Sequence, residues 1–292
     1  MLTPVIAGVD GSAESLAAAE WAAREAERRG CGLRLVHAWE RGPRPVRGAS
    51  AGAVHRHLAR RVLRQVEDRV RAVHPGTRLD DEQTEGPAGA VLLHAAEQAD
   101  LLVLGCRGLS GFTGFLVGSV ALDVVARATR PVVLVRAGEE AADEHLPAAD
   151  GSPSTRTGYR DVVLGVDTAD PCDEVIGFAF EEARLRRARL RAVHARQTGA
   201  ALGRALEETD ADALRSLTDV VGTWREKYPD VEVLTTVATG RAQSVLVRAA
   251  SGASLLVVGH RLTERPVGPL TGPVTHAVVH HVDCPVAVVP HV

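Results

Sequence analysis

A glycine-dense segment between residues 105 and 119 has the composition of a loop that holds phosphate groups. Glycines permit positive φ angles and let the backbone come close to a ligand. The segment ends at Gly118 and Ser119, where a helical pattern begins, so N–H groups and the helix dipole would face an anion there. The Ser119 hydroxyl adds a further donor. The alternative is a surface loop that the glycines only shape.

Other patterns that carry chemistry do not fit this chain. No GKS or GKT follows the loop, and no GxGxxG follows the first strand pattern, so neither a Walker P-loop nor a dinucleotide fingerprint is predicted. No Ser-His-Asp set or nucleophile elbow is present. His276 and His280 could turn two imidazoles toward a metal, but no third ligand accompanies them, so we interpret them as structural or solvated. Cys106 is interpreted as an inert small residue, with a redox-sensitive thiol as the alternative.

The segments that must position the loop alternate between apolar runs and helical patterns. Strands are predicted at residues 5–9, 33–39, 77–84, 101–105 and 132–135, and helices at 13–29, 53–73, 88–98 and 119–128. In the longest helix the predicted apolar positions are Val54, Leu58, Val62, Val66 and Val70. Because the strands are apolar on both faces, the pattern predicts a parallel sheet covered by helices.

In such a sheet, ligands bind beyond the carboxyl ends of the strands, at the point where the strand order reverses. In a doubly wound sheet with flavodoxin-like layering, that point lies beside the first strand. The loop that contains Asp10 and the loop that begins at Gly105 are therefore expected to lie close together.

The chain contains two copies of this arrangement. The strand that ends at Asp10 resembles the one that ends at Asp167, 157 residues later, and Gly105 pairs with Gly259, 154 residues later. We therefore predict two tandem α/β domains, residues 1–136 and 159–292, each with a doubly wound five-stranded parallel sheet. Residues 137–158, rich in small and polar types, are predicted to form an exposed linker.

Bulk composition limits the partners of this 292-residue chain. With a net charge of -3 and 3% aromatic residues, no nucleic-acid or anionic membrane partner is expected. The apolar runs are far shorter than the ~20 residues of a membrane span, and the start has no signal-peptide pattern, so a cytoplasmic protein is predicted. The scattered cysteines, Cys31, Cys106, Cys172 and Cys284, predict reduced thiols rather than disulfides or a metal framework.

The spacing of Gly105, Gly108, Gly118 and Ser119 resembles the G-x2-G-x9-G-(S/T) signature of ATP-binding members of the universal stress protein family. The sequences GVDGS at residues 8–12 and PVVLV at 131–135 are also similar to that family, and the resemblance covers both copies. It implies an adenine nucleotide alpha hydrolase-like fold with ATP as the ligand. Mg²⁺ or Mn²⁺ could accompany the phosphates, with Asp10 nearby.

The resemblance also implies residue roles in the first copy. Asp10 would contact the ribose, and an N-cap arrangement with Ser12 is a compatible alternative. Backbone around His37 and Ala38 would contact the adenine, while the His37 side chain is interpreted as packing. Arg107 could pair with a phosphate or be solvated. The predicted nucleotide-binding residues are Gly8, Val9, Asp10, His37, Ala38, Leu104, Gly105, Arg107, Gly108, Gly118, Ser119 and Val120.

The second copy keeps the spacing of the loop but not its fixed residues. Leu262 stands in place of Gly108, and Pro273 stands in place of Ser119. A branched side chain disfavours positive φ, and proline offers neither an N–H nor a hydroxyl to a phosphate. Glu264 would repel a triphosphate if it faced the site, although Asp167 persists. We therefore expect one ATP per chain, in the first copy.

Three functions are compatible with these patterns. The first is a binding and signalling module, in which ATP occupancy changes the conformation or partner affinity of a stress-response protein. The second is a slow metal-dependent ATPase, although no residue is placed to orient an attacking water. The third is an interaction protein that binds no nucleotide, which the intact first loop argues against.

The last strand of each copy carries an expectation about assembly. A short apolar strand at the edge of a sheet exposes backbone groups unless another element covers it. The family pairs domains through this strand, so the resemblance implies that residues 132–135 and 286–289 lie adjacent in an intrachain pseudo-dimer. Homodimers of whole chains are an open alternative.

Overall fold

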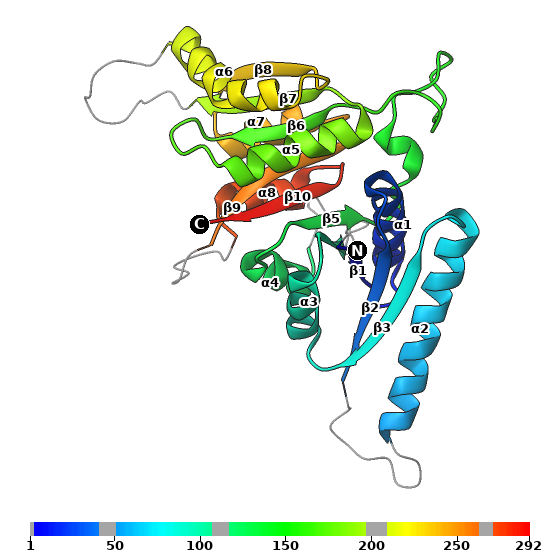
Figure 1. Ribbon diagram of the computed structural model, residues 1–292. Helices are drawn as coiled ribbons and strands as arrows, with labels where there is room; N and C mark the ends of the chain where they lie inside the picture. Colours follow the sequence, from blue (N-terminus) through cyan, green and yellow to red (C-terminus); the bar gives the residue numbers. More distant parts are fainter. Residues whose placement is uncertain (1–2, 41–50, 107–116, 197–208, 263–270) are drawn as a thin grey trace. The chain divides into compact units, whose positions relative to one another are not determined.

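The computed structural model describes residues 3–40, 51–106, 117–196, 209–262 and 271–292, with only the backbone at 51–55 (Figure 1). The chain divides into two compact units, residues 1–140 and 141–292. Each unit is an α/β domain with five parallel strands. None of the helices in the described ranges is long and apolar enough to cross a membrane.

The first unit alternates strands and helices in the predicted order. Its strands are β1 (Val5–Gly8), β2 (Leu33–Trp39), β3 (Leu79–Glu85), β4 (Leu101–Cys106) and β5 (Val132–Arg136). Its helices are α1 (Ala13–Arg29), α2 (Ala51–Val73), α3 (Ala88–Glu97) and α4 (Ser119–Arg127). Every predicted strand and helix of this copy is present, and each bound lies within two residues of the prediction.

The strands of the first unit lie in the order β3-β2-β1-β4-β5, and neighbouring strands are parallel. Helices α1 and α2 pack together on one face of the sheet, and α3 and α4 pack together on the other. The order reverses at β1, which lies between β2 and β4. This order differs from the flavodoxin order 2-1-3-4-5, but it brings the loops after β1 and β4 side by side, as the sequence predicted.

The second unit repeats the arrangement. Its strands lie in the order β8-β7-β6-β9-β10, with the reversal at β6. The strands are β6 (Val162–Val166), β7 (Leu190–Arg196), β8 (Val233–Thr239), β9 (Leu255–Arg261) and β10 (Val286–His291). The helices are α5 (Asp173–Arg186), α6 (Asp210–Lys227), α7 (Ala242–Ala249) and α8 (Pro273–His281).

Helix α5 begins three residues later than the matching helix of the first unit. Helix α1 begins at Ala13, whose counterpart 157 residues later is Asp170, whereas α5 begins at Asp173. Pro171 contributes to the delay, because the residue before a proline, here Asp170, is disfavoured in the α region. The segment Asp170-Pro171-Cys172 therefore replaces the first turn of the helix and lengthens the loop after β6.

The buried face of α2 differs from the predicted apolar stripe. Ala59, Leu63, Val66 and Val70 are buried, whereas Leu58 is 52% exposed. The predicted positions recur every four residues, and that period drifts around a helix with 3.6 residues per turn. The observed face follows steps of four, three and four, so it stays on one side of the helix.

The segment after β5 is not an exposed linker throughout. A 3-10 helix, Ala141–Glu144, is followed by an isolated antiparallel bridge between His145 and Tyr159. Glu144 and His145 are buried, and His145 Nδ1 lies 2.7 Å from the carbonyl oxygen of Thr157. The composition predicted exposure here because these contacts join residues too far apart to give a local pattern.

Candidate functional site

The loops after β1 and β4 meet at a pocket of the first unit with a volume of about 290 Å³. The pocket lies at the carboxyl ends of β1, β2 and β4, beside the first turns of α1, α3 and α4. Its lining residues are Gly8, Val9, Asp10, Ser12, Glu14, Ser15, Val36, Ala38, Ala88, Leu92, Leu104, Gly105, Gly118, Ser119, Val120 and Ala121. Nine of the twelve predicted residues are therefore together, while Arg107 and Gly108 lie outside the described residues.

Packing constrains both glycines on the strand side of the pocket, and it requires the one at position 105. A Cβ atom on Gly105 would lie 2.5 Å from the backbone carbon of Glu14 in the first turn of α1. A Cβ atom on Gly8 would lie 2.6 Å from a methyl group of Leu104. Gly105 therefore allows α1 to approach β4 closely, and this role is independent of any ligand.

Asp10 and Ser12 form the predicted N-cap arrangement at the start of α1. The Asp10 carboxylate accepts hydrogen bonds from the Ser12 N–H at 2.9 Å and the Ser12 hydroxyl at 2.5 Å. The Ser12 side chain in turn accepts from the Ser15 N–H at 3.2 Å. These bonds provide an acceptor for the Ser15 N–H, which has no partner within the helix, and hold the exposed Asp10 side chain at the pocket.

His37 does not line the pocket. Its Nδ1 atom lies 2.6 Å from the carbonyl oxygen of Val9, so Nδ1 carries the hydrogen and donates to that carbonyl. His194 makes the same contact with Val166 in the second unit, at 3.0 Å. Both histidines therefore tie the second strand of a unit to the end of its first strand, and in the first unit the neighbouring Ala38 reaches the pocket.

Helix α4 points its N-terminus at the pocket. Its first backbone bond runs from the Leu122 N–H to the Gly118 carbonyl, so the preceding N–H groups, including those of Ser119 and Val120, have no partner within the helix. Gly118 is the N-cap residue with φ -60° and makes no side-chain cap bond. Among the described residues, a Cβ atom on Gly118 would meet nothing within 4 Å, so they leave the space beside it open.

Cys106 ends β4 and is buried. Desolvation raises the pKa of its thiol to about 11, against a smaller lowering effect of Arg136. The thiol is therefore neutral near pH 7, which supports the interpretation of Cys106 as an inert side chain. All four cysteines lie in the described ranges, and none of them forms a disulfide.

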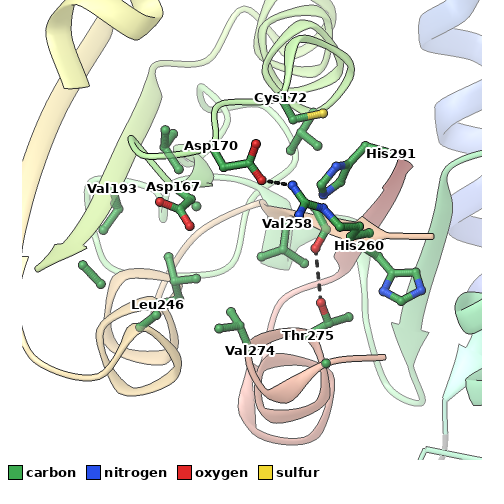
Figure 2. A pocket seen from close by; sticks show the side chains of 18 of the residues that line it. Asp167, Asp170, Cys172, Val193, Leu246, Val258, His260, Val274, Thr275 and His291 are labelled. Carbon is green, nitrogen blue, oxygen red and sulfur yellow. Dashed lines mark hydrogen bonds and ion pairs between the residues drawn. The ribbon is translucent and has the colours of Figure 1, made fainter. Parts of the chain in front are cut away.

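The second unit has a wider pocket at the matching place, with a volume of about 790 Å³ (Figure 2). Because the first turn of α5 is missing, the backbone that crowds Gly105 in the first unit has no counterpart over Gly259. A Cβ atom on Gly259 would instead meet side chains, those of Val175 at 3.1 Å and His291 at 3.2 Å. The later start of α5 therefore accounts for the wider pocket.

The second pocket has a polar rim with an internal ion pair. Asp170, in the lengthened loop, pairs with Arg261 at the end of β9, and both side chains line the pocket (Figure 2). Cys172 donates its thiol hydrogen to Glu174 at 3.0 Å. The Thr275 hydroxyl donates to the carbonyl oxygen of Gly259 at 3.3 Å.

The helix that faces the second pocket offers fewer donors than α4. Helix α8 begins at Pro273, which has no N–H, and its first backbone bond runs from the His276 N–H to the Gly272 carbonyl. The Leu262 N–H, which stands in place of that of Gly108, donates to the carbonyl oxygen of His291 at 2.8 Å. Both replaced positions of the second loop therefore lack a free backbone donor.

Comparison with known proteins identifies the family. The model of the universal stress protein family matches residues 1–136 and 158–290. The chain belongs to the universal stress protein family. A universal stress protein of Mycolicibacterium smegmatis (strain ATCC 700084 / mc(2)155) is 30% identical over 297 residues, which are 98% of this chain and 96% of that protein.

A universal stress protein of Mycobacterium tuberculosis (strain ATCC 25618 / H37Rv) is 30% identical over 295 residues, 97% of this chain and 95% of that protein. Among solved structures, a universal stress protein from Archaeoglobus fulgidus DSM 4304 has a TM-score of 0.72 at 17% identity, covering 99% of this chain and 98% of that one. The structural likeness shows that the universal stress protein fold is shared.

Several lining residues of the first pocket were missed by sequence reasoning. Ser15 could have been found, because it follows the N-cap Ser12 in the first turn of α1, and its hydroxyl accepts from the Asp10 N–H at 3.3 Å. Ala88 and Leu92 come from the start of α3, which carries no motif. The sheet order of the universal stress protein fold brings this helix to the pocket, and local sequence does not reveal that.

The paired histidines of α8 lie close together. The rings of His276 and His280 are 4.4 Å apart, and desolvation, followed by the charges of His280 and His281, lowers the pKa of His276. In the described parts of this universal stress protein, no group of three or more His, Cys, Asp or Glu side chains could hold a metal ion.

Proposed function

We propose that the first unit binds ATP, with the phosphates at the N-terminus of α4 and the nucleoside against the ends of β1 and β2. The observation that supports this most strongly is the single pocket at which Asp10, Ala38, Gly105 and the start of α4 come together. N–H groups without helical partners and the positive end of the helix dipole favour an anion at that place.

The residues predicted to bind the nucleotide have roles that follow from their places. The N–H groups of Ser119 and Val120 and the Ser119 hydroxyl donate to phosphate oxygens. The Asp10 carboxylate, already oriented by Ser12, accepts from the ribose hydroxyls. Backbone groups at His37 and Ala38 contact the adenine edge. From the sequence, Arg107 and Gly108 complete the phosphate loop.

The described walls of the pocket enclose about 290 Å³, just below the usual range of about 300–1,000 Å³ for small-molecule sites. The open space beside Gly118 would be filled by a larger side chain. If Mg²⁺ or Mn²⁺ accompanies ATP, Asp10 is the carboxylate among the predicted binding residues that could help to hold it.

We further propose that the protein works as a nucleotide-dependent module in a stress response, in which ATP occupancy changes the affinity for a protein partner. Slow hydrolysis of ATP is the rival function. Turnover assays on the nucleotide-loaded protein separate the two, since a signalling module retains intact ATP over hours. The pairing of the two units through their last strands stays a prediction of the sequence.

The proposal is tested first by denaturing mass spectrometry of the purified protein, which should release an adenine nucleotide. The sharper test is Gly118→Val. Gly118 has an ordinary φ of -60°, and its Cβ would meet no atom of the described residues within 4 Å, so the variant should fold normally. The new side chain would occupy the phosphate space and should weaken ATP binding by at least about a hundredfold, because several charge-assisted hydrogen bonds are lost.

Gly76→Val is the matched control, since its Cβ also meets nothing within 4 Å and the residue lies in an exposed turn away from the pocket. Calorimetry should give equal ATP affinities for this control and the unmodified chain. Undiminished ATP affinity in Gly118→Val, with an unchanged circular dichroism spectrum, would refute the proposed site.

A further inference from the structure

The wider pocket of the second unit has the features of a binding site for a different ligand. Its volume of about 790 Å³ lies within the range of small-molecule sites. Five buried apolar side chains line it, and they come from four different elements: Val175, Ile176, Val193, Leu246 and Val258. A ligand in this pocket must therefore have an apolar body.

The rim of the pocket offers one positive charge. Arg261 is the only lysine or arginine among the described lining residues, whereas Asp167 and Asp170 add two carboxylates. A polyphosphate would meet one arginine and two carboxylates, together with the three lining histidines, His194, His260 and His291. The backbone donors that would hold phosphates are also reduced, because Pro273 has no N–H and the Leu262 N–H is bonded to His291.

The pairing with Asp170 shows that Arg261 can bind a carboxylate in this pocket. The planar guanidinium group of arginine matches a carboxylate, with two parallel donors for two oxygens. In this structure Arg261 Nη2 is paired with one carboxylate oxygen, Oδ2, of Asp170, which is one of the three residues that replace the first turn of α5. The carboxylate of Asp170 therefore occupies the place beside Arg261 where the carboxylate of a ligand would bind.

We propose that the second unit binds a small organic monocarboxylate with an apolar body, and that the ligand's carboxylate replaces that of Asp170 on Arg261. The side chains of Asp170 and Arg261 are 58% and 53% exposed, and ion pairs of this kind contribute little to stability. Replacement of Asp170 by the ligand's carboxylate is therefore easy. Burial of the ligand's apolar body contributes a favourable free energy that the Asp170 side chain, which has no apolar body to bury, does not contribute. Asp170 competes with the ligand for Arg261 and so lowers the ligand's apparent affinity.

The test uses the full chain and two probe acids, 3-phenylpropionate and octanoate, each compared with its uncharged amide in ligand-detected NMR titrations. Each acid should bind at least about tenfold more tightly than its amide, because only the acid gains the charge-assisted bonds to Arg261. Asp170→Asn removes the competitor and should tighten binding of both acids about two- to fivefold, as expected for loss of an exposed ion pair. The same change should leave the affinity for the amides unaltered.

Arg261→Gln should abolish the difference between each acid and its amide. Asp161→Asn is the matched control, since Asp161 pairs with Arg189 in the same unit but does not line the pocket. It should leave all affinities unchanged. Equal binding of acids and amides, no binding of either acid by the chain and by Asp170→Asn, or no tightening in Asp170→Asn would each overturn the proposal.

The proposals for the two sites can be refuted independently of each other. Gly118→Val should lose ATP and keep the affinity for the acids, whereas Arg261→Gln should keep ATP and lose the preference for the acids. Loss of acid binding in Gly118→Val would place the acids in the first unit and would also overturn the proposal for Arg261.

Discussion

Burial at the end of β4 determines the chemistry of Cys106. The thiol is 4% exposed, and desolvation raises its pKa from 9.0 to about 11. The neutral form is therefore favoured in the folded state relative to the unfolded chain. Its contribution to stability is fully present below pH 9 and is lost as the pH rises through 11, because only the unfolded state ionises readily in that interval.

This linkage gives a prediction for alkaline solution. Between pH 8.5 and 10.5, the free energy of unfolding of the natural chain should fall by about 2 kcal/mol more than that of Cys106→Ala. Urea denaturation of both proteins at the two pH values measures this difference, and all other titrating groups cancel in the comparison. Equal pH dependence of the two proteins would show that the Cys106 thiol has an ordinary pKa.

At the residue scale, the sequence predicted which residues lie near the pocket better than it predicted why those residue types are needed there. Gly105 was predicted to hold phosphates, but its close approach to Glu14 shows that packing alone requires a glycine there. The interpretation of His37 as a packing residue is supported by its bond to Val9. Neither reason could be derived beforehand, because each depends on which strand or helix lies next to the residue.

At the element scale, the ends of α1 and α5 provide a natural comparison. Both helices end in a left-handed residue whose N–H caps the last turn: Gly30 in α1, with φ 64°, and Arg187 in α5, with φ 50°. These residues lie 157 positions apart, so they are equivalent in the two copies. Arg187 is the one non-glycine residue with positive φ in the described ranges.

Exchanging these residue types should move stability in opposite directions. Arg187→Gly should raise the free energy of unfolding by about 0.5–1 kcal/mol, because the left-handed region strains an L side chain and the greater entropy of glycine in the unfolded chain offsets only part of that gain. Gly30→Ala should lower it by a similar amount, although its Cβ would meet no atom within 4 Å. Chemical denaturation measures both changes. Destabilisation by Arg187→Gly would contradict the strain argument.

The elements themselves were largely predictable, since apolar runs and helical periodicity are local signals. The departures have identifiable physical causes. The buried face of α2 follows 3.6 residues per turn, whereas the predicted stripe used a spacing of four. The late start of α5 agrees with Pro171, because the residue before a proline is disfavoured in the α region. The buried Glu144 and His145 depend on contacts with no sequence pattern.

At the scale of the whole molecule, duplication has produced two pockets with different linings. Both lie where the strand order of a unit reverses, so the fold fixes their position. Their chemistry depends on a few replaced residues. In the second unit, α5 begins three residues later and the pocket is wider, while Pro273 removes a donor at the start of α8. Under the two proposals above, one chain combines two ligand specificities.

The clearest consequence for the whole chain is the stoichiometry of nucleotide binding. Relative to the first unit, the second lacks the N–H and hydroxyl at Pro273, and its Leu262 N–H is already bonded to His291. Each lost charge-assisted bond weakens phosphate binding by about 1.5–3 kcal/mol, so even two of these three losses reduce affinity by at least about a hundredfold. Calorimetric titration with ATP should give about one site per chain, and Gly118→Val should remove it. A stoichiometry near two, or ATP bound beside Gly272 in a crystal, would show that the second pocket holds phosphates without these donors.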